Sequence, residues 1–381
     1  MKLPVYLDYN ATTPIDPQVA DAIEPYLREH FGNPSSDHVY GRRAKETVIR
    51  ARQEVAALIG AIPEEIIFTG CATEANNLAI HGIARALWPS KRHLITSAVE
   101  HPSVMRPFLR LRDEGWSVTI LPVNGDGRVE PAAVVRNLRD DTALISVMHA
   151  NNETGAVQPI AEIAAIAQLH GILLHTDAAQ SVGKITVNVD RLKIDLLTLA
   201  GHKFYAAKGV GALYIRQGTP CLPPITVGAN HERGMRPGTE NVPALVGMGA
   251  AARLAHERLA SEEPRIAILR DRLYQHLQRS IPDLALNGPS NDRLPNTLNV
   301  SFPGVNGRDL LKAAASDIAA SVGSACHTEK GSAASGVLTA MALPAERIAG
   351  AVRLSLGTPT THADIDHAAQ ALTAAWRSLS K

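Results

Sequence analysis

The sequence predicts an α/β protein with a mostly parallel β-sheet, covered by helices on both faces, and a second, smaller α+β domain. Strand-like and helix-like segments alternate between residues 60 and 215, a pattern typical of parallel strands joined by crossover helices. After about residue 250, a long charged helical stretch is followed by shorter mixed segments. A chain of 381 residues is long enough to bury two cores.

The first region contains short apolar, β-rich runs separated by stretches with apolar residues at helical spacing. Gly115 and Gly171 each follow such a helical stretch and end it. The predicted strands are 66–69, 93–97, 116–122, 143–148, 172–176, 196–199 and 211–215, and the predicted helices are 73–87, 103–113 and 159–170.

The second region begins with a helix predicted over 250–279, which leads into three prolines. The segments expected after it are a strand (297–302), a helix (308–315), a Gly/Ser-rich loop (321–336), a strand (352–356) and a terminal helix (363–379). We therefore predict a large domain over residues 15–255 and a small domain formed by residues 1–14 and 256–381.

The composition excludes several classes of function. A net charge of +1 gives no electrostatic reason to expect nucleic acid or an acidic membrane surface as a partner. No apolar stretch approaches the roughly 18 residues of a membrane span, and the first residues lack the apolar core of a signal peptide. The three cysteines, Cys71, Cys221 and Cys326, form no zinc motif and are too few for a disulfide framework. We expect a cytoplasmic protein without a metal, in which a thiol is free to react.

Lys203 and Asp177 suggest a pyridoxal phosphate (PLP) enzyme. Each residue follows or ends an apolar strand-like run, and ligands of parallel sheets bind at the carboxyl ends of the strands. A lysine can form a Schiff base with the PLP aldehyde, and an aspartate can pair with the protonated ring nitrogen. The alternative is a surface lysine and an unrelated strand-end aspartate.

Three other motifs lie at predicted strand ends, each with a structural alternative. Thr73, in the segment 70–77, would begin a helix whose free N–H groups suit a phosphate, or it is only an N-cap. His101 could stack on a cofactor ring and move protons, or only cap the next helix. The amides of 151–155 could bond a ring oxygen, or only form a polar turn.

Cys326 and Arg353 are candidates for substrate chemistry. Small residues surround Cys326, which leaves the backbone free to move, and His327 and Lys330 favour the thiolate. The alternative is a chance cysteine in a loop. Arg353 lies within an apolar strand, where an arginine usually holds a carboxylate, either a structural one or that of the substrate.

Taken together and in this order, these motifs resemble the class I cysteine desulfurases, which are fold-type I PLP enzymes with a mostly parallel seven-stranded sheet in the large domain. The resemblance spans nearly the whole chain. The matching segments are 6–14, 31–36, 72–77, 99–101, 150–155, 175–180, 201–205, 231–239, 323–326 and 353–357.

The resemblance implies a role for each candidate residue. Lys203 would form the Schiff base, Asp177 would pair with the ring nitrogen and His101 would stack on the ring. Arg353 would hold the substrate carboxylate and Cys326 would attack the substrate sulfur, which leaves alanine and an enzyme persulfide. The other contacts that it implies are Asn152 and Gln180 to the phenolic oxygen, Thr73, His202 and Thr239 of the partner subunit to the phosphate, and Asn33 to the substrate carboxylate.

The resemblance further implies a homodimer that acts on L-cysteine and passes sulfur to an acceptor protein. Several positions depart from the family pattern, among them Ala200, which replaces a serine that would hold the phosphate, and Cys71, which replaces a glycine or serine. The others are in 206–209 and 228–230 and at Thr358. The segments 326–338 and 293–297 look more like those of selenocysteine lyases, so L-selenocysteine is an alternative substrate. An aminotransferase or racemase on the same fold and a non-catalytic scaffold are further alternatives. The sequence leaves open whether the acceptor serves iron–sulfur cluster assembly, tRNA thiolation, DNA phosphorothioation or selenium handling.

Overall fold

The structure is a computed structural model that describes residues 3–323 and 335–380. Its main feature is a seven-stranded sheet with the order β2-β8-β7-β6-β5-β3-β4. The strand β8 is antiparallel to both of its neighbours, and the other adjacent pairs are parallel. The strands are β2 (Ile66–Thr69), β3 (His93–Ser97), β4 (Ser117–Leu121), β5 (Thr142–Ser146), β6 (Leu173–Asp177), β7 (Leu196–Ala200) and β8 (Gly211–Ile215).

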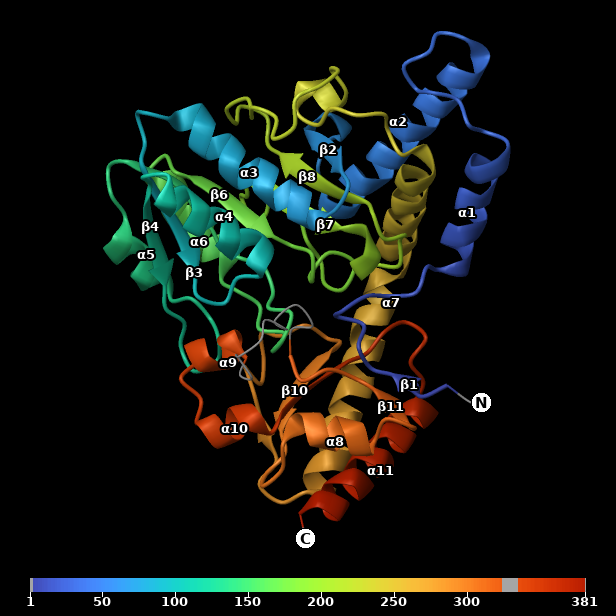
Figure 1. The fold of residues 1–381 in the computed structure, drawn as a ribbon, viewed down its shortest axis with the longest axis vertical. Coiled ribbons are helices and arrows are strands. Elements are labelled where there is room, and N and C mark those ends of the chain that lie inside the picture. The colour runs from blue at the N-terminus through green and yellow to red at the C-terminus, as the bar shows by residue number, and fades with distance from the viewer. Residues whose placement is uncertain (1–2, 324–334, 381) are drawn as a thin grey trace.

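Helices cover both faces of this sheet (Figure 1). Successive side chains of a strand point to opposite faces, so Leu144 packs in the same cluster as α3 and α4, whereas Ile145 packs with α2, α6 and α7. Both faces of the central strands are therefore buried, which explains their continuous apolar runs. The helices of these two layers are α2 (Val39–Ile59), α3 (Ala72–Leu87), α4 (Pro102–Asp113), α5 (Pro131–Asn137), α6 (Ile160–Leu169) and the first part of α7 (Val242–Ser280).

The second part of α7 belongs to a separate hydrophobic cluster with the C-terminal elements and Leu7. The N-terminal strand β1 pairs in parallel with β11, so the first residues of the chain join the C-terminal region. This region contains β1 (Val5–Tyr6), β9 (Ala285–Leu286), β10 (Thr297–Ser301), β11 (Ile318–Ala319), β12 (Ala351–Ser355), α8 (Gly307–Ala313), α9 (Gly336–Ala340), α10 (Ala345–Ala349) and α11 (His362–Leu379). The division near residue 255 falls inside α7 and remains a proposal.

The helix α7 is longer than the sequence predicts. It begins at Val242 rather than near residue 250. Asn241 caps this start, because its side chain accepts a hydrogen bond from the backbone N–H of Ala244. Its first turns are rich in Ala and Gly and buried around much of their circumference, which hides the helical period. The sequence pattern also did not reveal α1 (Pro17–Arg28) or α2. None of the helices in the described part of the chain is both long and apolar enough to cross a membrane.

Candidate active site

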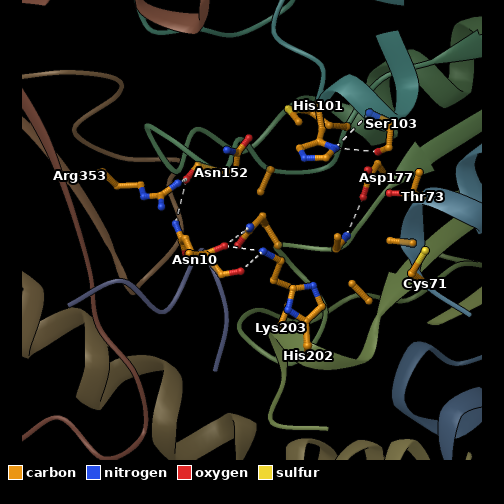
Figure 2. A pocket seen from close by; sticks show the side chains of 17 residues that line it. Asn10, Cys71, Thr73, His101, Ser103, Asn152, Asp177, His202, Lys203 and Arg353 are labelled. Atoms are coloured by element: carbon orange, nitrogen blue, oxygen red, sulfur yellow. Dashed lines mark hydrogen bonds between the residues drawn. The ribbon is translucent and has the colours of Figure 1, made fainter. Parts of the chain in front are cut away.

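A cavity of about 250 Å³ opens at the carboxyl ends of β6 and β7, between the large sheet and the C-terminal region. Figure 2 shows Lys203, His101 and Asp177 around the same open space, with Arg353 and Asn10 on another side of it. The structure thus brings together most of the site residues predicted from the sequence. Those that line the cavity are Thr73, His101, Asn152, Asp177, Gln180, His202, Lys203 and Arg353.

Lys203 ends the short 3-10 turn that follows β7. Its Nζ donates to the backbone oxygens of Asn10, at 2.6 Å, and Ala11, at 2.7 Å. Both acceptors belong to the N-terminal segment, so this segment positions the lysine over the cavity. An amine held there can join a carbonyl compound covalently and can carry a proton to or from it.

Asp177 and His101 are connected through a buried hydrogen-bond chain. Asn76 Nδ2 donates to Asp177 Oδ2 and to Ser103 Oγ, both at 2.8 Å. Ser103 Oγ lies 2.7 Å from His101 Nδ1, and the Ser103 N–H also donates to this nitrogen. Because a backbone N–H can only donate, Nδ1 is an acceptor and the neutral ring carries its proton on Nε2. His101 therefore both caps α4 and lines the cavity, so the two interpretations from the sequence are compatible.

The N-terminus of α3 forms one wall of the cavity through Cys71, Ala72 and Thr73. The N-cap is Cys71, without a side-chain cap bond, and Thr73 lies in the first turn, so the interpretation of Thr73 as N-cap is wrong. Free N–H groups and the helix dipole make such a terminus a binding site for a phosphate. Ala200, which also lines the cavity, adds no hydroxyl.

His202 lies next to Lys203 and stays neutral. Burial, followed by the positive charge of Lys203, lowers the pKa of His202 to about 4. Its Nδ1 lies 3.1 Å from Thr12 Oγ1. A neutral imidazole can donate a hydrogen bond to a phosphate but does not neutralise its charge.

Asn151 and Asn152, adjacent in sequence, have different tasks. Asn151 Oδ1 accepts from the backbone N–H groups of Glu153, at 2.9 Å, and Thr154, at 3.0 Å, which makes the polar turn. Asn152 lines the cavity. The turn and the site interpretations of this motif thus apply to different residues.

Arg353 is 2% exposed and already holds a carboxylate. Its Nη2 lies 2.7 Å from Asp8 Oδ1, and its Nη1 donates to the Asn152 backbone oxygen at 3.1 Å. Its Nε has no hydrogen-bond partner among the described residues. Arg353 therefore has a structural carboxylate partner and also lines the cavity, where a second carboxylate could bind.

Two predicted site residues, Asn33 and Thr239, are not among the described side chains that line this cavity. Asn33 is exposed, and its Oδ1 accepts from the backbone N–H of Ser35. Thr239 is also exposed. Cys326 lies outside the described residues.

The described residues on either side of the Cys326 segment both lie against Glu153. Ser335 Oγ donates to Glu153 Oε2 at 2.5 Å, and a Cβ placed on Gly323 would lie 3.0 Å from the same oxygen. Glu153 directly follows Asn152 of the cavity wall. Both residues that flank the Cys326 segment therefore lie near the cavity.

Asn10 is the main residue of the site that the sequence did not reveal. It is 1% exposed, and its backbone N–H donates to Ser355 Oγ while its Nδ2 donates to Thr297 Oγ1. Its partners are 345 and 287 positions away, so local patterns carry no signal for it. Only its place in a recognisable motif, 6–14, could have suggested a function.

The donor set of the cavity fits PLP. It combines an amine (Lys203), a buried carboxylate (Asp177), a neutral imidazole with a fixed tautomer (His101) and a helix N-terminus on one wall. These are the groups needed for an aldehyde, a pyridinium nitrogen, an aromatic ring and a phosphate. The fold and the site thus define a fold-type I PLP-dependent enzyme.

Comparison with known proteins agrees with this class. The family model of aminotransferase class-V matches residues 5–367, so the chain belongs to this family. It is 46% identical to cysteine desulfurase IscS of Dictyoglomus turgidum over 368 residues, which covers 96% of this chain and 93% of that protein. A solved structure described as a NifS-like protein superposes with a TM-score of 0.91 at 35% identity and covers 99% of this chain and 100% of its own. The structure of SspA in complex with cysteine superposes with a TM-score of 0.83 at 36% identity over 92% of this chain and 98% of its own.

Proposed function

We propose that this protein is a PLP-dependent cysteine desulfurase, which converts L-cysteine to L-alanine and keeps the sulfur as a persulfide on Cys326. The observation that carries the proposal is the cavity in which Lys203, Asp177, His101 and Arg353 meet. Relatives of nearly the same length that are named cysteine desulfurase support the choice of reaction. The bound cofactor supplies an electron sink for negative charge at the α carbon of the substrate.

Each of the candidate site residues has a distinct part in this reaction. The Lys203 amine would hold the cofactor at its aldehyde and would move protons at the α carbon, while Asp177 would pair with the protonated ring nitrogen. Arg353, which lines the cavity, holds the substrate carboxylate. The remaining proposed contacts are those of His101 with the ring face, of Asn152 and Gln180 with the phenolic oxygen, of Thr73 and His202 with the phosphate, and of Asn33 with the substrate carboxylate.

Cys326 is the proposed sulfur acceptor. Its thiolate attacks the sulfur of the substrate, a sulfur–sulfur bond forms, and the electron pair of the broken carbon–sulfur bond stays with the product. This product takes up a proton and leaves as alanine. The position of Gly323 and Ser335 next to Glu153 supports this role, because both flanks of the segment lie beside the cavity wall.

We further propose a cytoplasmic homodimer that delivers its persulfide sulfur to an acceptor protein. The exposed Thr239, which is absent from the cavity wall of its own subunit, supports a contribution of Thr239 of the partner subunit to the phosphate site. With three cysteines and no disulfide framework, the composition supports a reducing compartment.

A Cys326→Ser variant tests the reaction. We expect it to bind PLP with the visible absorbance of the wild type, whereas sulfide release and persulfide formation from L-cysteine fall to background. Cys221→Ser is the matched control, since Cys221 is exposed and is not among the described residues that line the cavity. Normal turnover of Cys326→Ser would remove this thiol from the mechanism.

A selenocysteine lyase is the second candidate, because the sequence around 326–338 favours it. Comparison of kcat/KM for L-cysteine and L-selenocysteine separates the two functions. A much larger value for L-selenocysteine, with little sulfide from L-cysteine, would replace the desulfurase by the lyase.

A further inference from the structure

Lys184 is a second lysine next to the candidate active site, and the mechanism above gives it no role. It follows Gln180 by four positions in a helix-like turn, in which its backbone N–H donates to the Ser181 oxygen. This spacing places the two side chains on the same side of the turn. Lys184 Nζ donates to Gln180 Oε1 at 2.7 Å and to Asn10 Oδ1 at 3.0 Å.

These bonds fix the orientation of the Gln180 amide. Lys184 Nζ donates to two oxygens at once, Gln180 Oε1 and Asn10 Oδ1, so the oxygen of the Gln180 amide faces it. Gln180 Nε2 then donates one hydrogen to the Asn10 backbone oxygen, at 3.0 Å. Since Gln180 also lines the cavity, its second N–H is left for a ligand. A flipped amide would set two donors against each other at Lys184 and present an oxygen to the ligand.

The same lysine fixes the Asn10 amide. Asn10 Oδ1 accepts from Lys184 and from Asn296 Nδ2, at 3.0 Å, while its Nδ2 donates to the Asn152 backbone oxygen and to Thr297. The Asn10 backbone oxygen in turn accepts from Lys203. Lys184 therefore holds both amides that flank the proposed catalytic lysine.

The electrostatic environment of Lys184 agrees with a hydrogen-bonding rather than an ion-pairing role. Burial lowers the pKa of Lys184 well below its usual range, and the positive charges of Lys203 and Arg353 lower it further. The salt bridges of the described residues include none to Lys184.

We propose that Lys184 is a positioning residue: it locks the Gln180 amide so that an N–H group, and not the carbonyl oxygen, faces the phenolic oxygen of PLP. This inference rests on the proposed function, because it assumes that PLP occupies the cavity with its phenolic oxygen at Gln180. Lys184 thus affects the cofactor through the Gln180 side chain rather than by direct contact.

The test compares PLP binding and spectra of purified apoenzymes. The variants are Lys184→Met, Gln180→Leu and the double variant, with Lys45→Met on the exposed side of α2 as the matched lysine control. Methionine keeps most of the volume of lysine without a donor. We expect Lys184→Met to weaken PLP binding about five- to tenfold, as for one hydrogen bond lost in a buried site, and to shift the absorbance maximum of bound PLP in the same direction as Gln180→Leu. The double variant should bind PLP no more weakly than Gln180→Leu alone.

The outcomes separate the inference from the proposed function. If the wild type fails to bind PLP, the proposed function is wrong. If the wild type binds PLP and Lys184→Met has the affinity and spectrum of the wild type, or if the two single losses add in the double variant, only the role of Lys184 is overturned. Should Lys184→Met not fold, a crystal structure of the wild-type holoenzyme decides. Lys184 Nζ within hydrogen-bond distance of the Gln180 oxygen and Nε2 at the cofactor support the proposal, and a lysine turned away from Gln180 refutes it.

Discussion

Glu100 directly precedes His101 and is buried without a cation to pair with among the contacts described. Its Oε1 accepts from Ser97 Oγ, at 2.6 Å, and from the Met148 N–H, at 2.8 Å, while its Oε2 has no partner among the described residues. Burial, opposed by these two hydrogen bonds, raises the pKa of Glu100 to about 8. The carboxyl group therefore keeps its proton at neutral pH, which limits the negative charge near Asp177.

This proton makes stability depend on pH. The pKa of Glu100 is higher in the folded state than in the unfolded state, so the folded protein holds this proton more tightly. The protonated carboxyl group therefore stabilises the fold, and this contribution is complete below about pH 4.5. The contribution is lost as the pH rises through about 8. Glu100→Gln mimics the protonated acid at every pH, so the wild type should lose stability relative to Glu100→Gln between pH 5 and pH 8, by on the order of a few kcal/mol.

Urea unfolding of both proteins at several pH values measures this difference. Other groups that titrate, such as the buried His149 and His175, are common to both proteins and cancel in the comparison. A constant difference across the range would show that Glu100 is already ionised in the folded protein.

The site residues that the sequence revealed are those whose position follows from local structure. Asp177 and Lys203 could be predicted because each stands at or just after the end of an apolar strand, and parallel strands bring their carboxyl ends to one edge. Asn10 could not be predicted, because its role comes from contacts with residues far along the chain. The pair Asn151 and Asn152 shows a second limit: a motif can mark a site without telling which of two amides builds the turn.

At the scale of elements, strands were easier to predict than helices. Strands buried on both faces are short apolar runs with clear ends, and the expected strand 93–97 coincides with β3. Amphipathic helices such as α3 were also recognisable, but the first turns of α7 are buried around much of their circumference. The helical period is therefore hidden there, and the start of α7 was placed eight residues too late.

The connection between Gly323 and Glu153 gives a prediction at this scale. Gly323 has φ 144°, a conformation that other residues rarely adopt, and an added Cβ would lie 3.0 Å from Glu153 Oε2. Gly323→Ala should therefore displace the start of the Cys326 segment. Strain of this kind costs about 1–3 kcal/mol, so we expect persulfide formation to slow by about tenfold or more, with PLP binding unchanged.

Gly336→Ala is the control on the other flank. Gly336 begins α9, and its added Cβ would meet nothing within 4 Å. Mass spectrometry of the persulfide at Cys326 after single turnover measures the effect. Equal rates for Gly323→Ala and Gly336→Ala would mean that the contact with Glu153 does not position the nucleophile.

At the scale of the whole molecule, the cavity wall of one chain holds most of the proposed PLP contacts but not Thr239. The proposed dimer explains this arrangement, since Thr239 of the partner subunit would complete the phosphate site. A mixed dimer tests it: one subunit carries Lys203→Ala, and the other carries Thr239→Ala. If Thr239 acts across the interface, the subunit with the intact Lys203 receives its threonine from the other subunit, and the dimer has one complete site.

We expect such mixed dimers, purified through two different affinity tags, to bind one PLP per dimer with wild-type affinity and to show about half of the wild-type activity. The homodimer of Thr239→Ala should bind PLP more weakly at both sites, by about fivefold for one lost hydrogen bond. If Thr239 instead acts within its own subunit, or not at all, the mixed dimer will bind PLP no better than the Thr239→Ala homodimer. A protein that remains monomeric at the concentrations used would refute the shared site directly, because no partner would be present to complete it.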